Sequence, residues 1–143
     1  MERYLRENIP LSQAMGVQVK VATPERVLLS APLAPNINHH ETLFGGSAAA
    51  LATLSAWTLL HLRLRVADAA TRLVIQRSSM EYEKPIPGDV EALCTFDDAT
   101  AWARFLAILD RRGRARLTLT AHLLHAGQRM AAFSGDFVAL QCE

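Results

Sequence analysis

The segment between residues 38 and 46 gathers groups that can hold or activate a polar substrate, because Asn38, His40 and Glu41 precede the pair Gly45 and Gly46. An asparagine amide can donate to a carbonyl oxygen or hold a water, and a histidine or carboxylate can take a proton from water. A ligand can approach glycine backbone closely, and free N–H groups at a helix start stabilise a developing oxyanion. The segment therefore predicts a site that can hold a polar group such as a carbonyl, with Gly46 as the candidate oxyanion donor.

Each of these residues also has a purely structural interpretation. The two glycines can serve only to let a loop enter a helix beneath a curved sheet, and Asn38 can form an Asx turn. His39, His40 and Glu41 can be solvated loop residues, with Glu41 favourably close to the positive end of a helix dipole. The geometry of the folded loop has to decide between these interpretations.

Length and composition predict one compact domain over residues 1–143, since 50% of the residues are hydrophobic and can form one core. The formal net charge is +1, so no overall field attracts nucleic acid or an anionic membrane. Cys94 and Cys142 have neither the number nor the spacing of a disulfide framework or zinc site, and no metal is expected. The N-terminus carries acids and no following apolar run, so we expect no secretion signal and a cytoplasmic location.

Residues 42–62 contain no Asp, Glu, Lys or Arg and approach the length of a membrane span. Against a span, the segment is mostly alanine, opens with two glycines and carries Ser47, Thr53, Ser55 and Thr58. A helix that is apolar on all sides in a soluble chain is surrounded by other elements, and alanines let strands approach it closely. We therefore expect a buried central helix and no membrane span.

The remaining elements are read from periodicity and turn residues. We expect a helix within the first fifteen residues, strands at 17–21, 27–31, 73–82, 90–96, 115–125 and 130–140, and a shaped loop at 32–41. Between residues 90–96 and 115–125 we expect an amphipathic surface helix, capped by Asp98 and ended by Gly113. This order predicts an α+β fold in which an antiparallel sheet curves around one long helix.

Alternation along the strand at 73–82 predicts that Gln76, Ser78 and Met80 share one face. It places Ile75, Arg77 and Ser79 on the opposite face. One polar side of this strand is expected to border the substrate cleft, so Ser78 is a candidate substrate contact.

Four arginines surround Gly113, namely Arg111, Arg112, Arg114 and Arg116. Such a group can grip the phosphates of coenzyme A or the phosphopantetheine of a carrier protein. Arg112 and Arg114 are therefore candidate substrate-binding residues, and a solvated helix end is the alternative interpretation.

Asn38, six residues before Phe44, Gly45 and Gly46, with an alanine-rich helix from Ala50, resembles the Asn to His-Gly-Gly to helix signature of PaaI-type hotdog thioesterases. The chain is more similar to a thioesterase family found alone or as the C-terminal domain of some GNAT acetyltransferases. That likeness covers nearly the whole chain and rests on Ile9, Pro10, Leu11 and Ser12, on Ala14 to Gly16, on Leu43 to Ser47, on Trp57, and on Arg112 to Arg116.

The resemblance implies a hotdog fold, in which about six antiparallel strands wrap a long helix. It also implies a homodimer or a dimer of dimers with acyl-thioester sites at the subunit interface. No metal or redox cofactor is implied, because coenzyme A or phosphopantetheine enters as part of the substrate.

The sequence departs from the PaaI pattern at two positions. Where that pattern has a helix carboxylate, nine residues after Phe44, this chain has Thr53, and residues 42–67 contain no carboxylate. Glu41 is therefore the leading replacement base, followed by His40 and His39, while Thr53 could position a water or the substrate. Phe44 stands where the signature has histidine and is expected to pack under the loop.

Further along the predicted helix, Leu54 and Trp57 are expected to fill core rather than to line an acyl tunnel. We expect an acyl thioester hydrolase in which Asn38 and Gly46 hold the carbonyl. A non-catalytic acyl-thioester-binding module serving a partner enzyme, such as an acetyltransferase, is the rival hypothesis. A hotdog hydratase is disfavoured, because residues 42–60 contain no histidine.

Overall fold

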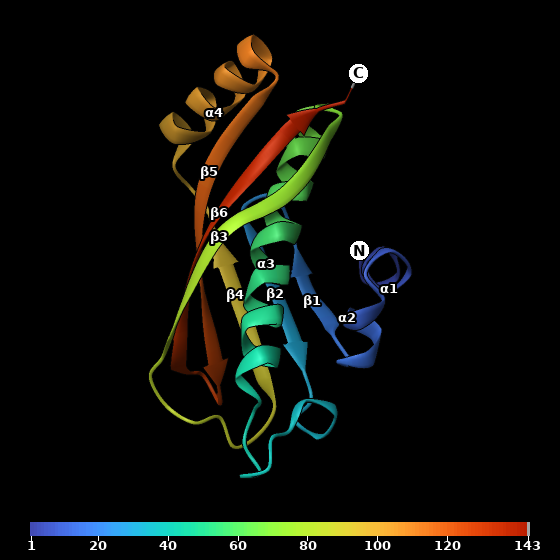
Figure 1. Cartoon of the computed structure of the whole chain (residues 1–143), viewed down its shortest axis with the longest axis vertical. Coiled ribbons are helices and arrows are strands. Elements are labelled where there is room, and N and C mark those ends of the chain that lie inside the picture. The colour runs from blue at the N-terminus through green and yellow to red at the C-terminus, as the bar shows by residue number, and fades with distance from the viewer. Residues whose placement is uncertain (143) are drawn as a thin grey trace.

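The computed structural model describes residues 1–142 and contains one antiparallel sheet, a long central helix and three shorter helices, with a 3-10 turn (Figure 1). The elements are α1 (Glu2–Asn8), α2 (Pro10–Ala14), β1 (Gln18–Ala22), β2 (Arg26–Ala31), η1 (Ala34–Asn36), α3 (Gly45–Val66), β3 (Thr71–Tyr82), β4 (Val90–Thr95), α4 (Ala99–Arg112), β5 (Arg114–His125) and β6 (Gln128–Gln141). The six strands lie in the order β1-β2-β4-β5-β6-β3. All five neighbouring pairs are antiparallel, so the predicted α+β class is confirmed.

Helix α3 lies along the inner face of the sheet and is buried over most of its length. Leu51, Ala52, Ala56, Leu59 and Leu60 have no exposed surface, so apolar side chains cover several sides of the helix. Burying each leucine stabilises the fold by about 1.5–3 kcal/mol, and the alanines between them allow close approach of the strands. This confirms the predicted buried helix. Within residues 1–142, no helix combines the length and hydrophobicity needed to span a bilayer.

Strand β3 forms one edge of the sheet, and a bulge changes which of its residues face α3. Ile75 lies opposite the buried Phe137, but Arg77 and Ser78 lie opposite Asp136 and Gly135. Gln76 is the extra residue between them. Paired residues share a face, so Ile75 and Ser78 both point towards α3.

The strict alternation expected for β3 was therefore wrong. Met80 lies opposite the buried Phe133 and also faces inward, as Ser78 does. Gln76 instead faces outward, where its Oε1 lies 3.5 Å from Nη1 of Arg116. The face shared by Ser78 and Met80 is thus the one that Ile75 occupies, not the one that Gln76 occupies.

Helix α4 is inserted between two strands that pair with each other, β4 and β5. The Asp98 side chain accepts a hydrogen bond from the Ala101 N–H at 2.9 Å, and Gly113 ends the helix with φ of +76°. Phe105 and Leu109 are buried, which gives the amphipathic helix that the sequence predicts. Figure 1 shows that α4 lies at the opposite end of the molecule from the start of α3.

Candidate active site

The chain between η1 and α3 is anchored by a buried asparagine that the sequence did not single out. The Asn36 amide donates to the carbonyls of Met15 and Pro32, each at 2.8 Å. Its backbone carbonyl accepts from the Phe44 N–H at 2.8 Å. These bonds fix both ends of the loop, because Asn36 and Phe44 lie on either side of it.

Asn38 organises the inside of the same loop. Its Oδ1 accepts from the backbone N–H groups of His40 at 2.8 Å and Thr42 at 3.1 Å. Its Nδ2 donates to Oγ1 of Thr42 at 2.9 Å and is 3.4 Å from the Leu43 carbonyl. The side chain therefore makes the Asx-type turn that was one of its two interpretations. In this conformation its amide holds the loop rather than pointing to an open ligand position.

The first turn of α3 presents backbone donors that no capping residue satisfies. Phe44 is the N-cap in extended conformation, and no side chain within residues 1–142 accepts from the helix start. Ala48 N–H bonds back to the Phe44 carbonyl at 3.0 Å, which leaves the N–H groups of Gly45, Gly46 and Ser47 without a backbone acceptor in the described chain. Gly46 is exposed. A helix of 22 residues thus directs its positive end at an accessible glycine.

The Phe44 ring lies over Gly46. A Cβ built on Gly46 would collide with that ring, whereas a Cβ on Gly45 would meet only ordinary contacts with Tyr82 at 3.6–3.7 Å. Phe44 is 56% exposed, so the prediction that it packs under the loop was wrong. The exposed ring therefore lies beside Gly46 and has room to move aside.

An apolar groove of about 280 Å³ follows the same face of α3. Its helix wall consists of Ala50, Thr53, Leu54 and Trp57, which succeed Gly46 at helical spacing. The other walls are formed by Ile9, which precedes α2, by Leu73, Val74 and Ile75 of β3, and by Phe137 of β6. Thr53 supplies the polar side chain among these lining residues. Leu54 and Trp57, expected mainly as core residues, also form part of the groove wall.

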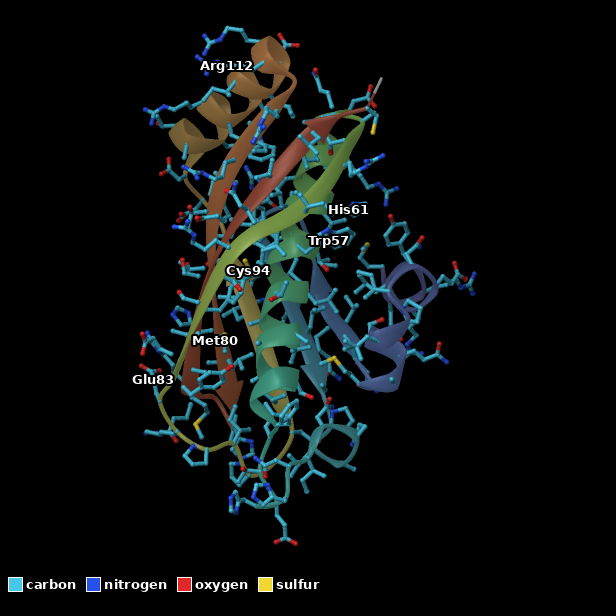
Figure 2. All side chains as sticks on the ribbon, in the orientation of Figure 1. Trp57, His61, Met80, Glu83, Cys94 and Arg112 are labelled. Carbon is cyan, nitrogen blue, oxygen red and sulfur yellow. The ribbon has the colours of Figure 1, made fainter. Side chains whose placement is uncertain are left out.

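A stack of three aromatic rings lies beyond the groove. The Trp57 and His61 rings stack at 4.8 Å between centroids, and Tyr4 stacks on the other side of His61 at 5.0 Å. Figure 2 labels Trp57 and His61 on successive turns of α3. Burial lowers the pKa of His61, and the nearby Arg65 lowers it further. Its Nε2 is buried without a hydrogen-bond partner among residues 1–142, so a neutral imidazole suits this position.

The three loop residues proposed as bases lie outside the groove. Glu41, His39 and His40 are exposed, and the two imidazole rings pack against each other at 3.8 Å. Glu41 has φ of +63°, which directs the loop into its tight turn. The structure therefore places Asn38 and Glu41 in the loop that leads to Gly46. None of these three residues lines the groove.

A second cavity of about 280 Å³ beside the helix start contains a carboxylate that the sequence interpretation missed. It is lined by Gly45, Tyr82 and Glu83, among others. The Tyr82 hydroxyl donates to the Gly45 carbonyl at 3.1 Å, and Glu83 pairs with Arg129 at 2.8 Å. The hydrogen bond from Arg129 lowers the pKa of Glu83, so this carboxylate is ionised at neutral pH.

Three further predicted contacts lie away from the loop. Ser78 is exposed on the inward side of β3. Arg112 is the last residue of α4, at the other end of the molecule (Figure 2), and Arg114 begins β5 two residues later. Within one chain, these arginines are therefore not assembled with Asn38 and Gly46.

Comparison with solved structures supports the hotdog architecture. A protein of unknown function from Chlorobaculum tepidum TLS is 27% identical with a TM-score of 0.94, and the alignment covers 99% of this chain and 92% of that one. A protein from Shewanella oneidensis described as a "putative thioesterase" is 27% identical with a TM-score of 0.86, covering 97% and 94%. The phenylacetic acid degradation protein PaaI from Thermus thermophilus shares the fold at 20% identity, with a TM-score of 0.68 and coverage of 93% and 99%.

The family comparison agrees with the resemblance inferred from the residues. The family described as "Putative thioesterase (yiiD_Cterm)" matches residues 1–141. By this match over nearly its whole length, the chain belongs to that thioesterase family of hotdog fold.

Proposed function

We propose that the chain hydrolyses acyl thioesters whose carbonyl is held at the first turn of α3. The observation that carries this proposal is the exposed Gly46 at the uncapped start of α3, directly above an apolar groove on the same helix face. A thioester combines a carbonyl that develops negative charge during hydrolysis with an apolar chain. The free N–H groups at the helix start can stabilise the charge on the carbonyl, and the groove can hold the apolar chain.

The helix sets the scale of the acyl group. From Gly46 to Trp57 the axial rise is roughly 16 Å, at 1.5 Å per residue. Trp57 is half-buried and is stacked on His61, so it forms a firm end wall for the groove. An acyl chain laid along Ala50 and Leu54 would therefore end against the indole.

We assign water activation to a carboxylate beside the start of α3 rather than to a residue of the groove. Two candidates flank the helix start, Glu41 in the loop and Glu83 in the cavity beside Gly45. The Arg129 pair keeps Glu83 ionised, which favours proton acceptance but also weakens it as a base. Asn38 acts indirectly by shaping the loop, and the substrate brings its own coenzyme A or phosphopantetheine.

We further propose that two copies pair through β3. This strand is a free edge of 12 residues, on which Val74 and Ile75 are 43% and 39% exposed. A long edge strand with exposed apolar residues is a template for pairing with another chain. Because β3 is also one wall of the groove, a second copy would cover the groove and complete the site.

A non-catalytic binding module is the second candidate, and the groove itself favours it. Thr53 is polar but cannot act as a base without a partner, and the groove-lining residues include no carboxylate or histidine. Such a chain would bind an acyl thioester and present it to a partner enzyme.

The test is a screen of the purified protein against acyl-CoA and acyl-carrier thioesters, with thiol release as the readout. Glu41→Gln and Glu83→Gln are made in parallel, and the variant that loses turnover identifies the base. Binding of a non-hydrolysable thioether analogue is measured for each protein. Binding without turnover of any thioester would support the module, and absence of both would overturn both proposals.

A further inference from the structure

A further cavity of about 340 Å³ lies at the C-terminal end of α3. Three segments enclose it, namely the last turns of α3, the turn between β1 and β2, and the first turns of α4. Apart from Arg63 and Glu25, the side chains that line it are apolar, and they include Val66, Trp102 and Leu106. The cavity shares no lining residue with the apolar groove, so the two sites are separate.

Arg63 is held in a fixed position on the wall of this cavity. Its guanidinium carbon lies 4.5 Å from the centroid of the Trp102 ring and 4.8 Å from that of the Phe96 ring. Its Nη1 donates to the Pro24 carbonyl at 2.8 Å. These contacts order the side chain before any ligand arrives, so little conformational entropy is lost when one binds.

The same contacts leave the guanidinium without an anion. Its Nε is buried without a hydrogen-bond partner, and Arg63 forms no ion pair within residues 1–142. Burial lowers the pKa of Arg63, and the attraction of the nearby Glu25 does not offset this effect. A partly buried guanidinium with unused donors favours an anion, and a carboxylate matches its planar geometry.

The apolar walls restrict which anion fits. Val66 is 74% exposed, more than any other large hydrophobic side chain in residues 1–142, and it borders the cavity. An alkyl group would cover this surface, whereas an inorganic anion would leave it in water. Arg63 lies over the Trp102 ring and Phe105 stacks with it at 5.2 Å, so little of the indole face remains for an aromatic ligand. The apolar part of the ligand is therefore aliphatic.

We propose that this cavity binds a small aliphatic monocarboxylate, whose carboxylate accepts hydrogen bonds from Arg63 and whose alkyl chain lies against Val66 and Leu106. Glu25 lines the same cavity and would repel a second carboxylate, which excludes a diacid. Because Glu25 is exposed, its own side chain can turn towards solvent when the ligand enters. The binding site does not depend on thioester hydrolysis and goes beyond the proposed function.

The two tryptophans of the chain allow the site to be located directly. Trp57 lines the groove and Trp102 lines this cavity, so their indole N–H signals in a proton–nitrogen correlation spectrum report which site a ligand enters. The substitution Trp57→Phe assigns the two signals. Titration of the full chain with hexanoate should shift the Trp102 signal until it saturates. Hexanamide, which has the same shape without the charge, should bind about tenfold more weakly.

Three variants test the charges. Arg63→Gln should weaken hexanoate binding by about tenfold or more. Arg65→Gln is the matched control, because Arg65 is exposed near the end of the same helix but does not line the cavity. Glu25→Gln removes a repelling charge at an exposed position and should strengthen binding about two- to fivefold. Thermal unfolding shows whether Arg63→Gln is folded, and Glu25→Gln keeps the proposal testable if it is not.

Stronger binding in Glu25→Gln, with unchanged binding in Arg65→Gln, would support the site. The proposal would be overturned if the Trp102 signal showed no saturable shift, if only the Trp57 signal moved, or if hexanamide bound as tightly as hexanoate. Weaker binding in Glu25→Gln, or equal losses in Arg65→Gln and Arg63→Gln, would overturn it as well.

Discussion

The substitution Gly46→Ala tests the oxyanion assignment without removing any side chain. The new Cβ would press on the Phe44 ring, at 3.0 Å from Cζ and 3.1 Å from Cδ2, and closer still to Cε2. Because that ring is 56% exposed, it can rotate outward, so the clash costs little folding energy. Replacing a helical glycine by alanine stabilises by about 0.5–1 kcal/mol, which raises the unfolding temperature by about 1–4 °C for a chain of this size.

Activity should change in the opposite direction. The methyl group and the displaced ring block the approach of a carbonyl to the Gly46 N–H. Loss of one oxyanion donor typically lowers kcat by about 10²-fold or more, close to 2.7 kcal/mol in the barrier. Gly45→Ala is the matched control, since its Cβ meets the Tyr82 ring at no less than 3.6 Å. It should gain the same helix stability and keep activity within about threefold of the wild type.

Thiol release from the thioester found in the screen and thermal unfolding by circular dichroism are measured on both variants. Full activity in Gly46→Ala would refute the oxyanion role. An unfolding temperature several degrees below that of Gly45→Ala would show instead that the second glycine is required for the loop to enter the helix.

Three further predictions concern groups elsewhere in the chain. Burial raises the pKa of the Cys94 thiol to about 12, so a thiol reagent at pH 8 should modify only the exposed Cys142 in the native protein and both cysteines after unfolding. Burial lowers the pKa of His61 from its ordinary 6.5, so the unfolded chain binds this proton first as the pH falls. The stability due to neutral His61 is thus complete above pH 6.5 and is lost as the pH falls from there towards the lowered pKa. The substitution His61→Phe keeps the ring stack and should make the unfolding temperature fall less steeply below neutral pH. An unchanged slope of unfolding temperature against pH would contradict the argument. Val74→Asp on β3 should convert a dimer to a monomer in light scattering, whereas Arg26→Asp on β2 should not; a monomeric wild type would exclude pairing through β3.

Features set by local sequence were predictable. The charge-free stretch from residue 42 becomes α3, and the Asp98 cap and Gly113 end define α4 as expected, because capping and helical periodicity act within a few residues. The faces of β3 were not predictable by alternation. Its bulge at Gln76 arises from pairing with β6, which lies more than fifty residues further along the chain.

The candidate site was likewise predictable only in part. The loop and glycines were found from their spacing, but Phe44 is exposed because no side chain among residues 1–142 covers it. Glu83 escaped notice because its position beside Gly45 depends on the Tyr82 contact, which joins residues 37 apart. Its place at the end of a strand with Lys84 and Pro85 suggests only a bend when the sequence is read alone.

Position 53 carries threonine rather than a carboxylate, and the effect of this difference can be tested by introducing an aspartate there. A carboxylate between Ala50 and Trp57 would lose much of its hydration in the groove, so the pKa of an introduced aspartate should lie above its ordinary 3.9. Below that pKa the side chain is neutral and tolerated, and above it the ionised form opposes both folding and binding of an apolar chain.

If the base lies beside the start of α3, as proposed, Thr53→Asp should lower kcat/KM by about tenfold at pH 8 and by less at pH 5. Thr53→Val, which removes the hydroxyl without adding charge, should leave hydrolysis within about threefold of the wild type. If the wild type only binds thioesters, the introduced carboxylate lies where a base would be needed, and turnover should appear as the pH rises through its raised pKa. A gain of hydrolysis in Thr53→Asp would therefore move the assignment from hydrolase to binding module, because it would show that the groove lacked nothing but the proton acceptor.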